Sequence, residues 1–293
     1  MDEGGTHNTE EPCGVVLRDV ECGGRVLLRR GDHSRVYRVH CAARGIWLGL
    51  KEEECIKPLA IVRAVAAIRR LRSEYLLRHY DVRVEGDRTV VTLTELMDCS
   101  LSDMRRRHSR LTEPQTKAVA FLVLHALEDL HSRLSMVHAD VSPSNILLKT
   151  TGELKLGDFA SAVRVDEAVE YFAGTVFYTP VEVLRDRQLA SRPASDIWAL
   201  GVTLYECASG DHPFVVPCNN DFWFFLLAME EAKKSGKHPQ NVPHTSDEFY
   251  DFFTSVLRWD PALRPTARSL LHHTWFSQFS VVAAHNELRL MAD

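Results

Sequence analysis

The stretch that decides the fold runs from Met136 to Ala160 and reads MVHADVSPSNILLKTTGELKLGDFA. Its second half holds two short apolar runs on either side of Thr150-Thr151-Gly152, a pattern typical of a β-hairpin. An exposed hairpin inside a helical region often carries function. The polar residues at its two ends are therefore the first candidates for chemistry.

The rest of the chain changes pattern on either side of this stretch. From Val15 to Leu50, the β-favouring runs GRVLLRR, SRVYRVH and GIWLGLK alternate with turns. One helix is predicted after Pro58, and two further strands are predicted around Glu85-Gly86-Asp87. Helical spacing then dominates, over Thr116–Leu134, Asp196–Ser209 and Asp247–Leu257. The pattern predicts a β-rich first third and a mostly α-helical remainder.

The order His138-Ala139-Asp140, then Asn145, then Asp158-Phe159-Ala160 resembles the catalytic core of protein kinases, with its H-R-D-L-x-x-x-N loop and D-F-G metal site. Further segments similar to that family are Gly174-Thr175, Glu182, Asp196–Gly201, Gly210–Phe214 and Asp260–Pro265. The resemblance covers about residues 20 to 280. It implies an α+β, bilobal protein-kinase-like fold, with a small β-rich N-lobe and a larger, mostly α-helical C-lobe.

The resemblance also divides the chain. Residues 1–13 are polar and without periodicity, which predicts a flexible N-terminal tail. The N-lobe is expected over 14–96 and the C-lobe over 97–280, followed by a C-terminal tail over 281–293. The apolar residues after position 277 are expected to pack back on the C-lobe, and a short docking helix is the alternative.

Catalytic roles follow from the resemblance together with the chemistry of the residues. Asp140 is the candidate catalytic base, which would accept the proton of an incoming hydroxyl. Asn145 and Asp158 offer hard oxygen ligands for Mg²⁺. Lys51 ends the apolar run Leu48–Lys51 and looks like the strand lysine that neutralises the ATP phosphates. A turn-forming aspartate and a solvent-facing lysine are the structural alternatives.

The resemblance places the nucleotide in a slot lined from several segments. Thr94-Glu95-Leu96-Met97 resembles the hinge that binds the adenine edge, with Thr94 as gatekeeper and with backbone groups near Glu95 and Met97 as partners. The glycine-rich loop corresponds to Arg29–Tyr37. The predicted cofactor-binding residues are Gly31, Val36, Gly49, Lys51, Thr94, Glu95, Met97, Leu147 and Asp158. Val36 and Leu147 also fit a purely structural role in the core.

Several residues depart from the family pattern around the phosphates. Gly31 alone remains of the three loop glycines, and Ala64 stands where the helix glutamate that pairs with the strand lysine is expected. No acid lies between Cys55 and Ser73, so Lys51 is left to pair with Asp158, a neighbouring acid or the nucleotide. Misplacement of the helix relative to the family is the alternative explanation.

Three further departures lie beside the catalytic residues. Ala139 replaces the arginine of H-R-D, which removes the usual guanidinium partner of a phosphorylated activation segment. Ser142 stands where Ser/Thr kinases carry a lysine, and losing such a donor lowers rates by about 10²- to 10³-fold. Ala160 replaces the glycine of D-F-G but leaves the metal ligand in place.

Composition excludes other classes of protein. The 293 residues are 45% hydrophobic and 26% charged, and 35 basic against 40 acidic residues give a net charge of -5, which indicates neither disorder nor nucleic-acid binding. The apolar runs are shorter than the roughly 20 residues of a membrane span. The start of the chain lacks the basic and apolar regions of a secretory signal, and its seven scattered cysteines fit reduced thiols. An intracellular location, cytoplasmic or nuclear or both, is expected.

Function is therefore predicted as an ATP- and Mg²⁺-dependent protein serine/threonine kinase that transfers the γ-phosphate to protein hydroxyls, at a rate that the departures reduce. The alternative is a pseudokinase, which would bind nucleotide or a protein partner as a scaffold without catalysis. A small-molecule kinase is a third interpretation. The segment from Gly174 to Glu182 argues against it, because this segment resembles a peptide-docking loop. Fold alone does not separate the three.

Overall fold

The computed structural model describes residues 15–20, 24–31, 33–169, 174–214 and 221–291, which form two compact units. The first unit contains the described residues up to Pro58 together with 79–96, and the second contains 59–78 together with the described residues from 97 onward. The helix that follows Pro58 thus groups with the second unit rather than with the strands on either side of it. The predicted tail over residues 1–13 lies outside the described residues.

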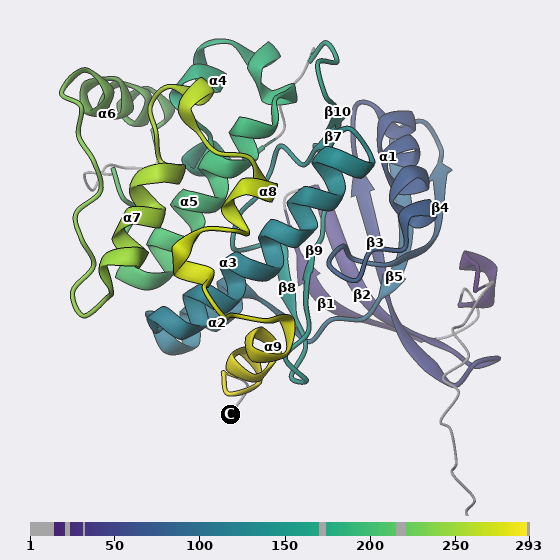
Figure 1. Cartoon of the computed structure of the whole chain (residues 1–293). Coiled ribbons are helices and arrows are strands. Elements are labelled where there is room, and N and C mark those ends of the chain that lie inside the picture. The colour runs from purple at the N-terminus through teal and green to yellow at the C-terminus, as the bar shows by residue number, and fades with distance from the viewer. Residues whose placement is uncertain (1–14, 21–23, 32, 170–173, 215–220, 292–293) are drawn as a thin grey trace, which may run out of the picture. The chain divides into compact units, whose positions relative to one another are not determined.

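The first unit is built on one antiparallel sheet with the strand order β1-β2-β3-β5-β4 (Figure 1). The short helical turn η1 (Leu17–Asp19) precedes it. Its strands are β1 (Arg25–Arg30), β2 (Ser34–Cys41), β3 (Ile46–Glu54), β4 (His79–Glu85) and β5 (Thr89–Glu95). These are the runs that the sequence predicts, and Gly86 with φ +60° makes the turn between β4 and β5. The predicted strands of the first third are therefore confirmed.

Side-chain alternation along β3 decides what each face of this sheet carries. Leu48 and Leu50 are buried in an apolar cluster with Val39 and Leu93. Because successive strand residues point to opposite faces, Gly49, Lys51 and Glu53 occupy the other face of β3. Lys51 is thus on the face opposite this apolar cluster.

The second unit is mostly helical and is centred on α3 and α5, which pack on each other (Figure 1). Its helices are α1 (Pro58–Leu71), α2 (Leu101–His108), α3 (Glu113–Glu128), α4 (Val181–Arg185), α5 (Pro193–Ser209), α6 (Phe222–Lys234), α7 (Asp247–Val256), α8 (Ala267–Leu270) and α9 (Val281–Arg289). Shorter turns are η2 (Asp129–Arg133, π-helical), η3 (Val176–Tyr178), η4 (Arg187–Ser191), η5 (Pro261–Leu263) and η6 (Thr274–Phe276). Among the described residues, none of the helices combines the length and apolar character needed to cross a membrane.

Short strands in the second unit hold the catalytic segment. Strands β8 (Ile146–Leu148) and β9 (Leu154–Leu156) form the predicted antiparallel hairpin, and β6 (Cys99–Ser100) pairs with β8. Strands β7 (Met136–Val137) and β10 (Val163–Arg164) pair with each other on either side of the hairpin in sequence. The stretch from Met136 to Ala160 therefore folds as strand β7 followed by the hairpin β8–β9, and β10 follows just after it.

The C-terminal helix α9 lies against the turn of this hairpin (Figure 1). Gly152 has φ +91°, and a Cβ atom there would lie 2.1 Å from the carbonyl oxygen of His285. Ala284, Leu288 and Met291 are buried in the apolar core of the second unit. Packing of the segment after residue 277 is therefore confirmed, and glycine is required where the hairpin turn meets α9.

Candidate active site

The catalytic loop is anchored to the start of α5 by one buried carboxylate. Asp196 is 1% exposed and accepts hydrogen bonds from the backbone N–H groups of His138 (2.8 Å) and Ala139 (2.9 Å). It also lies 2.9 Å from Nε2 of His131. Ala139 has φ +60°, a strained conformation for a residue with a Cβ atom, and these bonds hold it.

His138 connects the loop to the end of the hairpin. Its Nδ1 atom accepts a hydrogen bond from the N–H of Asp140 (3.3 Å), so Nε2 carries the proton and donates to the carbonyl oxygen of Gly157 (2.9 Å). The N–H of Gly157 in turn donates to the carbonyl oxygen of Asn145 (2.8 Å). The hairpin thus brings Asn145 next to the residue that precedes Asp158.

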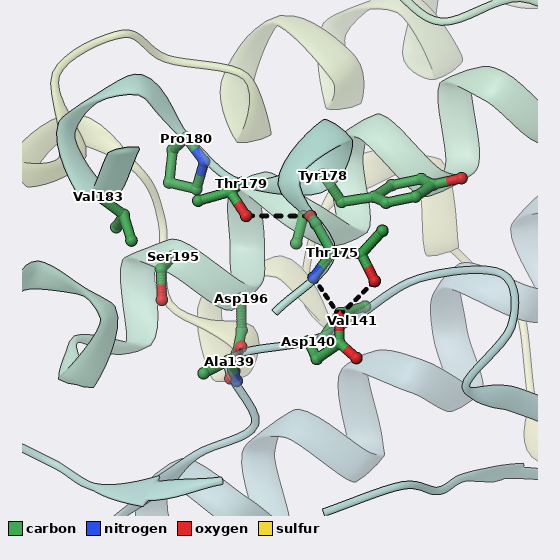
Figure 2. Close-up of a pocket in the computed structure, with 11 residues that line it drawn as sticks. Ala139, Asp140, Val141, Thr175, Tyr178, Thr179, Pro180, Val183, Ser195 and Asp196 are labelled. Carbon is green, nitrogen blue, oxygen red and sulfur yellow. Dashed lines mark hydrogen bonds between the residues drawn. The ribbon is translucent and has the colours of Figure 1, made fainter. Parts of the chain in front are cut away.

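The carboxylate of Asp140 is held by hydrogen bonds from both sides, of which Figure 2 shows those from Thr175. Its Oδ1 atom accepts from the backbone N–H and from the hydroxyl of Thr175, each at 2.7 Å. Its Oδ2 atom accepts from Nδ2 of Asn145 at 2.8 Å. The position of a candidate base is therefore fixed by the loop and by the activation segment together.

The electrostatic environment of Asp140 favours the protonated carboxyl relative to an aspartate in water. Burial raises the pKa of Asp140, and the nearby charge of Asp158 adds to this rise. The hydrogen bonds from Thr175 oppose it, because they stabilise the ionised form. A carboxyl group with a raised pKa in a small pocket is typical of a functional carboxylate.

The oxygen ligands at the hairpin ends fit a magnesium ion. Asn145 is 8% exposed, and its Nδ2 atom donates both to the carboxylate and to the carbonyl oxygen of Asp140, each at 2.8 Å. This leaves its amide oxygen as the side-chain atom available to a cation. Amide and carboxylate oxygens are the ligands that Mg²⁺ prefers, so Asn145 and Asp158 are a chemically suitable pair.

Lys51 is not the solvent-facing lysine of the structural alternative. Its side chain is 18% exposed, and Nζ lies 2.7 Å from Oε2 of Glu53 on the same strand. Of the partners that the sequence leaves open for Lys51, the structure thus shows a neighbouring acid. The helix α1 carries no acid, and Ala64 is buried within the core of the second unit.

The predicted nucleotide-binding residues divide between the two units. In the first unit, Gly49 pairs in register with Thr94, and Thr94 Oγ1 donates to the carbonyl oxygen of Glu95 at 3.0 Å. Val36 on β2 pairs in register with Lys51 on β3. Val36, Gly49, Lys51, Thr94 and Glu95 thus lie on three adjacent strands of the sheet. Gly31 lies at the β1–β2 turn, where its N–H donates to the carbonyl oxygen of Ser34 at 2.8 Å. A Cβ atom at Gly49 would lie 2.7 Å from Thr94 Oγ1, so glycine permits the close approach of this threonine.

The remaining predicted residues belong to the second unit. Met97 and Leu147 are partly buried against its apolar core, as the structural alternative for Leu147 supposed. Asp158 has φ +60° and is followed by the buried Phe159, whose ring packs on His138 with centroids 5.3 Å apart. The structure therefore brings together Asp140, Asn145 and Asp158 in one unit and the lysine group in the other.

Ser142 provides no substitute for the lysine that the resemblance expects at its position. It is 2% exposed, and its hydroxyl has no hydrogen-bond partner within the described part of the chain. Its carbonyl oxygen accepts from the N–H of Asn145 at 3.0 Å, so the residue shapes the loop. The departure at this position is real and removes a positive charge from the loop.

The activation segment corresponds to residues 158–182, and its part up to Val169 is held by hydrogen bonds to Gln188 and Ser191. The side-chain amide of Gln188 binds the backbone of Val169 twice, accepting from its N–H and donating to its carbonyl oxygen, each at 3.0 Å. Val169 is buried with Val183 and Ala190. The N–H of Asp166 donates to the carbonyl oxygen of Ser191 at 3.2 Å. These bonds fix the segment up to Val169 although Ala139 offers no guanidinium.

Glu182 and Arg264 form a buried ion pair in the second unit. Arg264 Nη1 lies 2.6 Å from Glu182 Oε1, and the two side chains are 0% and 11% exposed. The guanidinium also lies 4.7 Å from the centre of the Trp198 ring and donates to the carbonyl oxygens of Arg258 and Ala194. Burial lowers the pKa of Arg264, and the charge of Glu182 opposes this change. The pair is part of the scaffold.

Two organising contacts were not predicted from the sequence. Asp196 and Thr175 both lie in segments that resemble the family, but neither had been assigned the bonds to the catalytic loop that the structure shows. Their signal in the sequence is the pair of short segments Gly174-Thr175 and Asp196–Gly201. For Lys51, the sequence predicts a neighbouring acid as one possible partner but does not single out Glu53.

Comparison with known proteins identifies a family and several relatives that match most of this chain. The family described as protein kinase domain matches residues 28–276. Mitogen-activated protein kinase kinase 1c of Physcomitrium patens is 35% identical over 199 residues, which are 66% of this chain and 57% of that protein. Mitogen-activated protein kinase kinase 7 of Arabidopsis thaliana is 28% identical over 277 residues, which cover 90% of this chain and 87% of that protein.

Other relatives are longer than this chain. The match to MAP kinase kinase MKK1/SSP32 of Saccharomyces cerevisiae is 27% identical over 230 residues, which are 73% of this chain and 44% of that protein. The chain spans about half the length of several of the curated relatives that it matches.

Proposed function

The chain belongs to the protein kinase family, and from this membership we propose that it transfers the γ-phosphate of ATP to serine or threonine hydroxyls of a protein substrate. The observation that carries the proposal is the arrangement of Asp140, Asn145 and Asp158 around one hairpin. Protein kinases as a family use ATP with Mg²⁺. The loss of the other two loop glycines and the serine at position 142 support a low rate rather than a different reaction.

Asp140 acts on the substrate hydroxyl in this mechanism. Thr175 and Asn145 hold its two oxygens, so the carboxylate needs little reorganisation to accept the hydroxyl proton as the oxygen attacks phosphorus. Asn145 and Asp158 would hold the magnesium ion, which neutralises phosphate charge when bound. Lys51 would bind the phosphates as a second cation. Positioning and charge neutralisation supply most of the catalysis in this class of reaction.

The nucleotide base is assigned to residues near the hinge. Backbone groups at Glu95 and Met97 would bind the adenine edge, with Thr94 as gatekeeper. Val36, Gly49 and Leu147 would form apolar contacts with the purine, and Gly31 would approach the phosphates. The close approach of Thr94 Oγ1 to Gly49 supports this assignment, because it places the proposed gatekeeper beside a residue that has no side chain.

A pseudokinase role is not favoured. All three polar groups at the hairpin ends are in place, and relatives such as the proteins of Physcomitrium patens and Arabidopsis thaliana are named as kinases of mitogen-activated protein kinases. Those names suggest that the protein substrate is itself a protein kinase. The clamp of Gln188 on Val169 further supports activity without phosphorylation of the activation segment.

The test is transfer of labelled phosphate from ATP to three matched peptides with serine, threonine or tyrosine as the only acceptor. We expect label on the serine and threonine peptides, and the same rate after the enzyme has been treated with a phosphatase that is then removed. Label on tyrosine alone would contradict the proposed substrate class. Loss of transfer after phosphatase treatment would show that the segment needs a phosphate.

A further inference from the structure

The position of Lys51 raises a question that the family pattern does not answer. The helix α1 has the sequence PLAIVRAVAAIRRL, which contains no carboxylate in any register. Ala64 is 3% exposed and is packed in the apolar core of the second unit. The ammonium of a functional lysine needs an anionic partner to hold it in one place. That partner must come from an element other than α1.

Glu53 meets this need from the same strand. Its Oε2 atom lies 2.7 Å from Nζ of Lys51, and the two side chains are 10% and 18% exposed. The two residues are two positions apart on β3, so their side chains leave the same face of the sheet. Strand β3 is hydrogen-bonded to β2 on one side and to β5 on the other. The pair therefore lies on the central strand of the sheet.

The surroundings of Glu53 place it beside the predicted glycine-rich loop, Arg29–Tyr37. It pairs in register with Ser34 on β2 and with the fully buried Val90 on β5. The next residue on β3, Glu54, donates its backbone N–H to the carbonyl oxygen of His33 in the β1–β2 turn at 2.9 Å. The neighbouring Glu52 leaves the opposite face of the strand and binds Arg25 Nη1 at 2.5 Å. Adjacent glutamates thus serve different partners.

We propose that Glu53 is the positioning residue of Lys51, which takes the part that a helix glutamate plays in the family pattern. This inference rests on the proposed phosphotransferase function. Because both members of the pair are on one strand, Lys51 stays oriented whatever the position of α1. Movement of this helix would then not disconnect the lysine, which removes one way of switching the enzyme off.

The kinetic test compares Glu53→Gln with Glu52→Gln, which makes the same chemical change on the opposite face of the same strand. We expect Glu53→Gln to lower kcat/KM for ATP by about 10- to 100-fold, the scale of a misplaced catalytic group. Glu53→Asp should recover most of this loss because it restores the charge. Glu52→Gln should stay within about twofold of the wild type, since it removes only an exposed ion pair.

A second readout does not depend on activity. Acylation of Lys51 by an N-hydroxysuccinimide ester at pH 8, followed by peptide mass spectrometry, should be about three- to tenfold faster in Glu53→Gln, because a carboxylate favours the unreactive ammonium. Glu52→Gln should leave the rate of acylation unchanged. Acylation of Lys51 that is equal in the wild type and in Glu53→Gln would overturn the pairing.

The two readouts separate this inference from the proposed function. If the wild type transfers no phosphate, the proposed function fails, while the acylation rates still decide whether Glu53 holds Lys51. If the wild type is active and Glu53→Gln matches Glu52→Gln in kcat/KM, the function stands and the positioning role is wrong. A Glu53→Gln variant that binds ATP more tightly would also overturn it, because Glu53 would then compete with the nucleotide for the lysine.

Discussion

Replacing Asp140 by Asn is expected to lower kcat by about 10²- to 10⁴-fold, the range for removal of a positioned general base. The amide keeps an oxygen that accepts both hydrogen bonds from Thr175, whereas its NH2 group cannot accept the bond from Asn145 Nδ2, so one of the three side-chain bonds is lost. It cannot accept the proton of the substrate hydroxyl. The measurement is steady-state phosphate transfer to a serine peptide at saturating ATP and Mg²⁺.

The matched control for this variant is Asp166→Asn. Asp166 is exposed on the activation segment and has φ +58°, a conformation that asparagine also tolerates. Asp166→Asn makes the same carboxylate-to-amide change outside the catalytic loop. The rate of phosphate transfer should therefore change less than about threefold. Equal rates in Asp140→Asn and Asp166→Asn would exclude Asp140 as the base.

The largest effect on stability is expected for Glu182→Ala. Arg264 has no exposed side-chain surface, and Glu182 is its carboxylate partner at 2.6 Å. Removing one partner of a buried ion pair leaves an uncompensated charge, which costs about 3–5 kcal/mol of unfolding free energy. The lowered pKa of Arg264 agrees with this expectation, since burial already disfavours the charged guanidinium. Urea-induced unfolding, followed by tryptophan fluorescence, measures the loss.

Glu230→Ala is the control for that substitution. Glu230 pairs with Arg185, whose side chain is 58% exposed, at 2.6 Å. An ion pair that is open to solvent contributes about 0–1 kcal/mol, so this variant should unfold close to the wild type. If Glu182→Ala were no less stable than Glu230→Ala, the scaffold role of the buried pair would be wrong.

The hairpin and the strands could be predicted from sequence because their signals are local. Thr150-Thr151-Gly152 separates the short runs Ile146–Leu148 and Leu154–Leu156, and only glycine fits the turn that α9 covers. Asp140 and Asp158, the outermost of the three polar site residues around the hairpin, are 18 positions apart in the chain. A local pattern therefore places Asn145 beside Gly157 without knowledge of the rest of the fold.

Contacts between distant segments could not be predicted in the same way. Asp196 binds a backbone N–H group 57 positions away, and Thr175 binds a carboxylate 35 positions away. Which N–H or carboxylate each side chain reaches depends on how α5 and the activation segment pack, which periodicity does not encode. The short segments around Thr175 and Asp196 indicated only that these residues belong to the resemblance.

The partner of Lys51 shows a different limit. Strand alternation places Glu53 on the face of Lys51 in every register, because the two residues are two positions apart. It does not tell whether the two side chains meet, since Asp158 and the nucleotide are also possible partners from the sequence. The distance of 2.7 Å between Lys51 Nζ and Glu53 Oε2 identifies the partner.

The most direct test of the proposed function is Mg²⁺-dependent transfer of labelled phosphate from ATP by the purified chain and by its Asp158→Asn variant. The variant keeps the size of the side chain but loses the charge that would bind the metal, and it also controls for a contaminating kinase. We expect clear incorporation by the wild type and a fall of at least about 10²-fold in the variant. Incorporation that is equal in both, or absent from both at high enzyme and nucleotide concentrations, would contradict the assignment of this chain as an active protein kinase.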